Sequence, residues 1–146
     1  HHRVKMLDII KAHINSERLI ISNYELTLDK YYGTYYTLQY FNHPYFVIGS
    51  DALASIHRWI KFPDIVMENR FLVLPRKGYN IDEIFTYNDL NQYRDHFRIL
   101  DNFNEIDISS TMYRNNKNDD LVLKAVNEYI KDNNLYEVNE CTHMDL

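Results

Sequence analysis

Tyr45-Phe46-Val47-Ile48-Gly49-Ser50-Asp51 is the stretch that decides the fold of this chain. An apolar run followed at once by a glycine and a carboxylate predicts a short strand over 45–48 that leaves its sheet at a functional site. Glycine occurs at only 3 of the 146 positions, so Gly49 is expected where a side chain will not fit. Asp51 is expected either to bind a ligand or to cap the helix that follows.

Strand and helix patterns alternate on both sides of this stretch. Strands are expected over 19–22, 45–48, 71–74 and 97–100. Helices are expected over 4–14, 34–41, 53–59, 64–68, 81–85 and 120–132, with one more after Ser109. Such alternation is typical of an α/β fold with a parallel sheet covered on both faces. Sites in these folds lie at the carboxyl ends of the strands, where Gly49 and Asp51 fall.

A second informative segment is Asp107-Ile108-Ser109-Ser110-Thr111-Met112-Tyr113-Arg114. Three hydroxyl residues before a helix can present backbone N–H groups and the positive end of the helix dipole to an anion. Arg114 lies one helical turn beyond Ser110 and Thr111, where its guanidinium can reach the same anion. The segment indicates a phosphorylated ligand; the alternative is an ordinary capped helix with a surface arginine.

Composition narrows the class of protein. A net charge of −5, from 16 basic and 21 acidic residues, argues against a protein that binds duplex nucleic acid. The single cysteine and the scattered histidines show no metal-ligand spacing, so no metal held by protein ligands is expected. One cysteine also cannot form an internal disulfide, so a cytoplasmic setting is the default expectation. No apolar run approaches the roughly 20 residues that span a bilayer, so no membrane association is expected. The oligomeric state is left open, a homo-oligomer included.

The two segments together resemble the nicotinate-nucleotide adenylyltransferases, a family of the nucleotidyltransferase superfamily. The resemblance rests on Gly49-Ser50-Asp51, on Trp59, and on the run from Ile108 to Arg114, and weaker similarity covers almost the whole chain in the expected order. It implies a Rossmann-like, doubly wound parallel sheet that lacks its first strand and helix, because the family's amino-terminal phosphate-binding segment has no counterpart here. Residues 1–137 are expected to form the nucleotidyltransferase domain and 138–146 a tail or the start of a further segment.

The resemblance also implies the reaction and its substrates. The adenylyl group of ATP, which carries Mg²⁺ on its phosphates, is expected to be transferred to nicotinate mononucleotide, which gives nicotinate adenine dinucleotide and pyrophosphate. ATP is expected to be bound by Gly49 and Asp51 and by the run Ile108, Ser109, Ser110, Thr111 and Arg114, with Ser110 and Arg114 acting in catalysis.

The mononucleotide is expected to be bound by a different set of residues, namely Thr34, Tyr35, Thr37, Trp59 and Arg76. Here the family's usual acidic residue between the two threonines is replaced by Tyr36. Trp59 would stack on the pyridine ring, and is otherwise a core tryptophan. Arg76 would face the nucleotide, and is otherwise a solvated loop residue.

Two other functions stay open from the sequence. A phosphopantetheine adenylyltransferase shares the fold and the Ser-Ser-Thr helix, although Gly-Ser-Asp with a tryptophan eight positions later favours the nicotinate enzyme. A non-catalytic nucleotide-binding module is the other alternative, because the residues that handle the ATP phosphates at the family's amino terminus have no counterpart in this sequence.

Overall fold

The computed structural model describes residues 1–102, 107–116 and 119–137. The chain forms two compact units. The first unit consists of His1–Asn23 and Ile108–Leu146, and the second unit consists of Tyr24–Asp107. The tail expected over 138–146 lies outside the described residues. In the described part of the chain, no helix is long and apolar enough to cross a membrane.

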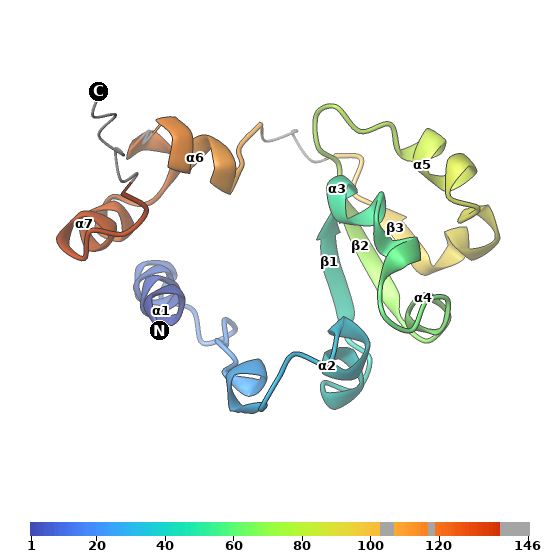
Figure 1. The fold of residues 1–146 in the computed structure, drawn as a ribbon, viewed down its shortest axis with the longest axis horizontal. Coiled ribbons are helices and arrows are strands. Elements are labelled where there is room, and N and C mark those ends of the chain that lie inside the picture. Colours follow the sequence, from blue (N-terminus) through green and yellow to red (C-terminus); the bar gives the residue numbers. More distant parts are fainter. Residues whose placement is uncertain (103–106, 117–118, 138–146) are drawn as a thin grey trace, which may run out of the picture. The chain divides into compact units, whose positions relative to one another are not determined.

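A three-stranded parallel sheet forms the centre of the second unit (Figure 1). Its strands are β1 (Tyr45–Gly49), β2 (Arg70–Leu74) and β3 (Phe97–Ile99), in the order β1-β2-β3. Both pairings are parallel, and the β1–β2 register runs from Tyr45 opposite Arg70 to Gly49 opposite Leu74. The parallel sheet and three of the four strands predicted from the sequence are therefore confirmed.

The core of the second unit lies against β2. Phe71 and Val73 of this strand are fully buried. The Phe71 ring stacks on Phe97 of β3 with ring centroids 5.1 Å apart, and Phe85 meets Phe97 edge-on at 5.3 Å. Full burial of such a side chain contributes about 1.5–3 kcal/mol. This packing holds the central strand in place. Residues at its carboxyl end are therefore well positioned to form a site.

Short helices connect and flank these strands. The α-helices of the second unit are α2 (Thr34–Tyr40), α3 (Ser50–Leu53), α4 (Asp64–Met67) and α5 (Ile81–Tyr87). The 3-10 helices are η1 (Tyr24–Thr27), η2 (Ile56–Arg58) and η3 (Asn91–His96). α5 begins after Asn80, whose side-chain oxygen accepts the Glu83 N–H at 3.2 Å.

The single helix predicted over 53–59 is wrong. α3 begins directly after β1 and ends at Leu53, and η2 follows as a separate turn. The reason lies at Ser55, whose hydroxyl donates to the Ala52 carbonyl at 3.1 Å and accepts the Trp59 indole N–H at 3.2 Å. A serine hydroxyl that bonds to nearby groups in this way competes with the regular helical pattern.

The first unit is helical. It contains α1 (His2–Ile14), α6 (Ser110–Asn116), the 3-10 helix η4 (Asp119–Leu121) and α7 (Lys124–Asp132). Helix α7 turns Val126, Asn127 and Ile130 inward, and the His2 ring bonds to the Tyr129 hydroxyl at 2.8 Å between α1 and α7. The helix predicted over 120–132 therefore begins later, at Lys124, because residues 119–121 form η4.

The strand predicted over 19–22 is also wrong. These residues form no strand and no helix, and the Ile20 side chain is 80% exposed. An apolar run becomes a strand only where a neighbouring strand satisfies its backbone groups. Among the described residues, every strand pair lies within the sheet β1-β2-β3.

Candidate functional site

The carboxyl ends of β1 and β2 bring together a carboxylate and a guanidinium. Arg76 lies two residues beyond the end of β2, and its Nη1 donates to Asp51 Oδ2 at 2.9 Å. The two side chains are 33% and 41% exposed, so both remain accessible to a ligand. Arg76 was predicted to bind one nucleotide and Asp51 the other, and the structure makes them direct partners.

Gly49 makes this close arrangement possible. A Cβ atom at position 49 would collide with Asp51 Oδ1 and would lie 3.1 Å from Arg76 Cδ. A side chain at position 49 would therefore displace the ion pair, which takes the space beside Gly49. Asp51 is the second residue of α3, where a negative charge also favours the helix dipole.

A second group of predicted residues lies around the start of α2. Gly33 precedes this helix with φ of 114°, a conformation that only glycine adopts readily. A Cβ atom there would lie 3.1 Å from Ile60 Cδ1, so the start of α2 packs against the residue that follows Trp59. Trp59 itself is partly buried against the core and meets Phe46 edge-on at 6.5 Å. The structure thus brings the α2 start close to Trp59.

The hydroxyl groups of α2 bond within the protein. Thr34 Oγ1 pairs with the Tyr31 hydroxyl at 2.8 Å, and Thr37 Oγ1 donates to a Glu25 carboxylate oxygen at 2.8 Å. The Tyr35 ring is buried, and its hydroxyl donates to Glu68 at 2.9 Å, which raises the pKa of Tyr35. Each of these three hydroxyl groups thus already has a protein partner.

In the first unit, the predicted anion segment begins α6. Ser109 Oγ accepts the Met112 N–H at 3.1 Å, so this hydroxyl caps the helix. Ser110, Thr111 and Arg114 are exposed, and Arg114 Nη2 donates to Thr111 Oγ1 at 3.3 Å. A cation and a hydroxyl thus lie together on one turn, as the spacing of the sequence predicted.

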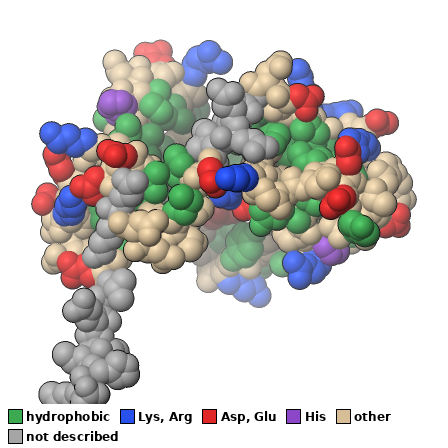
Figure 2. Space-filling view, turned by 90° about the horizontal axis from the view of Figure 1, so that it is seen from above, with side chains coloured by type: hydrophobic (Ala, Val, Ile, Leu, Met, Phe, Trp, Pro, Cys, Tyr) green, Lys and Arg blue, Asp and Glu red, His purple; other side chains and the backbone are tan. Residues whose placement is uncertain are grey.

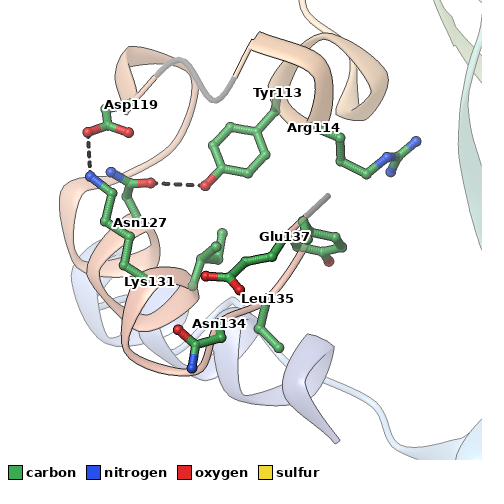
Figure 3. A pocket seen from close by; sticks show the side chains of 10 residues that line it. Tyr113, Arg114, Asp119, Asn127, Lys131, Asn134, Leu135 and Glu137 are labelled. Carbon is green, nitrogen blue, oxygen red and sulfur yellow. Dashed lines mark hydrogen bonds and ion pairs between the residues drawn. The ribbon is translucent and has the colours of Figure 1, made fainter. Parts of the chain in front are cut away.

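A polar network joins α6 to η4 and α7 (Figure 3). The Tyr113 hydroxyl donates to Asn127 Oδ1 at 2.9 Å, and Asn127 is only 6% exposed. Lys131 Nζ lies 2.7 Å from Asp119 Oδ2. Hydrogen bonds from Lys131 and then Asn127 lower the pKa of Asp119, and the bond to Asp119 raises the pKa of Lys131. Burial, followed by the charge of Asp119, raises the pKa of Tyr113.

This network fixes the orientation of α6. Figure 3 shows the Arg114 side chain extending away from the bonded Tyr113, which follows from their adjacent positions on the helix. A cavity of about 430 Å³ also lies in the first unit, with mostly apolar walls from α1, α6 and α7. Ser109, Ser110 and Arg114 line this cavity as well.

Charged side chains of both signs are interspersed on the face drawn in Figure 2. Lys and Arg do not gather there into one basic patch of the kind that duplex nucleic acid requires.

Comparison with known protein families identifies the chain. The cytidylyltransferase-like family model matches residues 1–116. A probable nicotinate-nucleotide adenylyltransferase of Clostridium kluyveri is 31% identical over 89% of this chain and 72% of its own length. The chain belongs to the nicotinate-nucleotide adenylyltransferase family.

Other members show the same relationship. A probable nicotinate-nucleotide adenylyltransferase of Acholeplasma laidlawii is 29% identical over 93% of this chain and 71% of its own length. A solved nicotinic acid mononucleotide adenylyltransferase of Plasmodium falciparum, complexed with APC, superposes with a TM-score of 0.68 at 25% identity. That match covers 95% of this chain and 76% of the solved one. Further relatives of the same name are matched over 38 to 64% of their length. The Rossmann-like nucleotidyltransferase fold expected from the sequence is confirmed by this match.

Sequence reasoning missed three polar residues that shape these sites. Ser50 is fully buried, and its Oγ accepts the Arg76 N–H at 2.8 Å. Tyr113 and Asn127 make the bond that fixes α6. In the sequence, Ser50 is indistinguishable from an ordinary motif residue beside Asp51. Asn127 did give a signal, because an asparagine inside the helix pattern of α7 indicates a buried polar group with a hydrogen-bond partner.

Proposed function

We propose that this protein transfers the adenylyl group of ATP to nicotinate mononucleotide. The observation that carries the proposal is the arrangement of Gly49, Asp51 and Arg76 at the carboxyl ends of β1 and β2. It occurs in a chain that belongs to the nicotinate-nucleotide adenylyltransferases. Parallel α/β folds bind their ligands at this edge of the sheet.

In the proposed reaction, an oxygen of the 5′-phosphate of nicotinate mononucleotide attacks the α-phosphorus of ATP. A new phosphorus–oxygen bond forms as the bond from the α-phosphorus to the bridging oxygen breaks, and pyrophosphate leaves with the electron pair. No covalent bond to the protein is needed. The two reactants are polyanions that repel each other, so the protein acts by alignment and by placing positive charge. Alignment alone can lower such a barrier by about 7–11 kcal/mol.

We assign the contacts with ATP to the residues that the sequence predicted for it. In the second unit, Asp51 accepts hydrogen bonds from a ribose hydroxyl, and Gly49 allows a close approach to the backbone. In the first unit, the segment from Ile108 to Thr111 donates to the phosphates. Arg114 and Ser110 carry the greatest weight in catalysis, because negative charge builds up on the pyrophosphate as it leaves.

We assign the contacts with the mononucleotide to the second unit. Trp59 stacks on the pyridine ring, and the start of α2, with the backbone N–H groups of Thr34 and Tyr35 and the side chain of Thr37, meets the pyridine carboxylate. Arg76 adds positive charge to this site. The contact between Gly33 and Ile60 supports the assignment, because it sets the start of α2 close to Trp59.

Mg²⁺ enters this proposal on the phosphates of ATP. In the described parts of the chain, no group of three or more His, Cys, Asp or Glu side chains is placed to hold a metal ion. An ion coordinated mainly by phosphate oxygens fits such a surface, since Mg²⁺ is commonly held by substrate phosphates and a few waters. The ion offsets charge on the phosphates. A cytoplasmic setting stays a prediction.

The test is pyrophosphate release from ATP and Mg²⁺, measured with nicotinate mononucleotide, nicotinamide mononucleotide or phosphopantetheine as acceptor. We expect release with the nicotinate compound, and a decrease of at least tenfold for Arg114→Gln, because a charged hydrogen bond contributes about 1.5–3 kcal/mol. Lys124→Gln is the matched control, since Lys124 is exposed on α7 and its replacement removes one positive charge, as Arg114→Gln does. Release with phosphopantetheine alone, or binding of nucleotide without release, would assign a different function.

A further inference from the structure

Ser50 occupies an unusual place for a polar side chain. It begins α3 directly after β1, and it is fully buried. A buried hydroxyl is stable only when it is hydrogen-bonded, and Ser50 Oγ accepts the Arg76 backbone N–H at 2.8 Å. Ser50 thus connects the ends of β1 and β2.

The bond between Ser50 and Arg76 continues the pairing of β1 and β2, with a side-chain oxygen in place of a backbone carbonyl. The register of β1 and β2 ends where Gly49 lies opposite Leu74. The next residue is Pro75, which has no N–H to offer to the sheet. Ser50 therefore binds the first backbone N–H available beyond the proline, which is that of Arg76.

The ion pair alone is a weak means of holding Arg76. Its side chains are 33% and 41% exposed, and ion pairs exposed to that degree contribute little. A buried hydrogen bond on the backbone of the same residue fixes where its side chain starts. Gly49 leaves the space into which Asp51 and Arg76 then fold.

We propose that Ser50 is a positioning residue: its buried hydroxyl fixes the backbone of Arg76 and so holds the guanidinium beside Asp51, ready to bind nicotinate mononucleotide. Ser50 itself touches no substrate and acts through Arg76. The inference rests on the proposed function, because that function assigns Arg76 to the mononucleotide.

The experiment is a double-mutant cycle on the affinity for nicotinate mononucleotide, measured by isothermal titration calorimetry. Ser50→Ala is expected to weaken binding about threefold to tenfold, and Arg76→Gln about tenfold or more. If Ser50 acts through Arg76, adding Ser50→Ala to Arg76→Gln changes the affinity by less than about twofold. Independent effects that multiply would overturn the inference.

Asn69→Ala is the matched control. Asn69 is 2% exposed, and its amide donates to the Ile65 carbonyl at 2.8 Å and pairs with His43 at 3.0 Å. It lies just before β2, at the end of the strand opposite to Arg76. We expect this variant to lower the melting temperature without changing the affinity. An equal loss of affinity in Asn69→Ala would mean that Ser50→Ala reports stability alone.

A readout without ligand separates the two proposals. Amide hydrogen exchange at Arg76 should accelerate in Ser50→Ala, because its N–H loses its acceptor. If the wild-type protein fails to bind the mononucleotide, the proposed function fails. The exchange rate at Arg76 still decides whether Ser50 fixes the backbone of Arg76. Unchanged exchange at Arg76 would overturn the inference even in a protein that binds.

Discussion

Replacing Gly49 with alanine should separate nucleotide binding from stability. The backbone at Gly49 is extended, with φ of −81° and ψ of 163°, so alanine fits it without strain. The new Cβ would instead collide with Asp51 Oδ1 and crowd Arg76 Cδ at 3.1 Å. The Asp51 carboxylate would have to turn aside, and Arg76 would have to shift by a few tenths of an ångström.

The expected change in stability is small. Loss of the exposed ion pair costs about 0.2–1 kcal/mol. Alanine reduces the freedom of the unfolded chain, which stabilises the folded state by about 0.4–1 kcal/mol. The two contributions oppose each other, so the free energy of unfolding should stay within about 1 kcal/mol of the wild-type value.

The expected change in binding is larger. An Asp51 carboxylate turned away from the ribose loses hydrogen bonds of about 1.5–3 kcal/mol, which weakens ATP binding about 10- to 150-fold. Calorimetry with a non-hydrolysable ATP analogue and thermal melting measure the two quantities. Gly78→Ala is the control. Its φ of 86° strains alanine, but no atoms lie within 4 Å of the added Cβ, so this variant introduces backbone strain without crowding. Wild-type affinity in Gly49→Ala, or a loss of stability above about 2 kcal/mol, would refute the reasoning.

Three further predictions concern the core, the pyridine site and the response to acid. Phe71→Ala should lower the free energy of unfolding by about 3–5 kcal/mol in denaturant titrations, because it empties a fully buried site; a loss below about 1 kcal/mol would contradict the assigned core. Trp59→Leu should weaken nicotinate mononucleotide by about 0.5–1.5 kcal/mol in calorimetry and leave the ATP analogue unchanged; equal losses for both would argue for a core role. The folded pKa of Asp119 lies below its ordinary value of 3.8, so its bond with Lys131 stabilises the fold above that pH and is lost as the pH falls through the folded pKa. The free energies of unfolding of wild type and Asp119→Asn should therefore differ near neutral pH and converge once the pH has fallen below the folded pKa of Asp119; a constant difference would contradict the assignment.

The sequence determined the elements whose patterns are local. Apolar runs ended by glycine or proline predicted β1 and β2, and both form where expected. The same kind of run over 19–22 forms no strand, because a strand depends on a partner that the run itself does not encode. The helix predicted over 53–59 divides because the Ser55 hydroxyl bonds to Ala52 and Trp59, a choice that propensity does not reveal.

The candidate site divides in the same way. The motif Gly49-Ser50-Asp51 and the turn from Thr111 to Arg114 were evident from spacing, because neighbours in the chain are neighbours on a strand end or a helix turn. The ion pair of Asp51 with Arg76 was not, because it joins residues 25 positions apart through the register of two strands. Ser50 and Asn127 acquire their roles only when burial removes water and leaves protein groups as their hydrogen-bond partners. The sequence thus determined which chemistry the chain carries, and the tertiary structure alone decided which groups meet, because pairing over long separations depends on packing and not on local pattern.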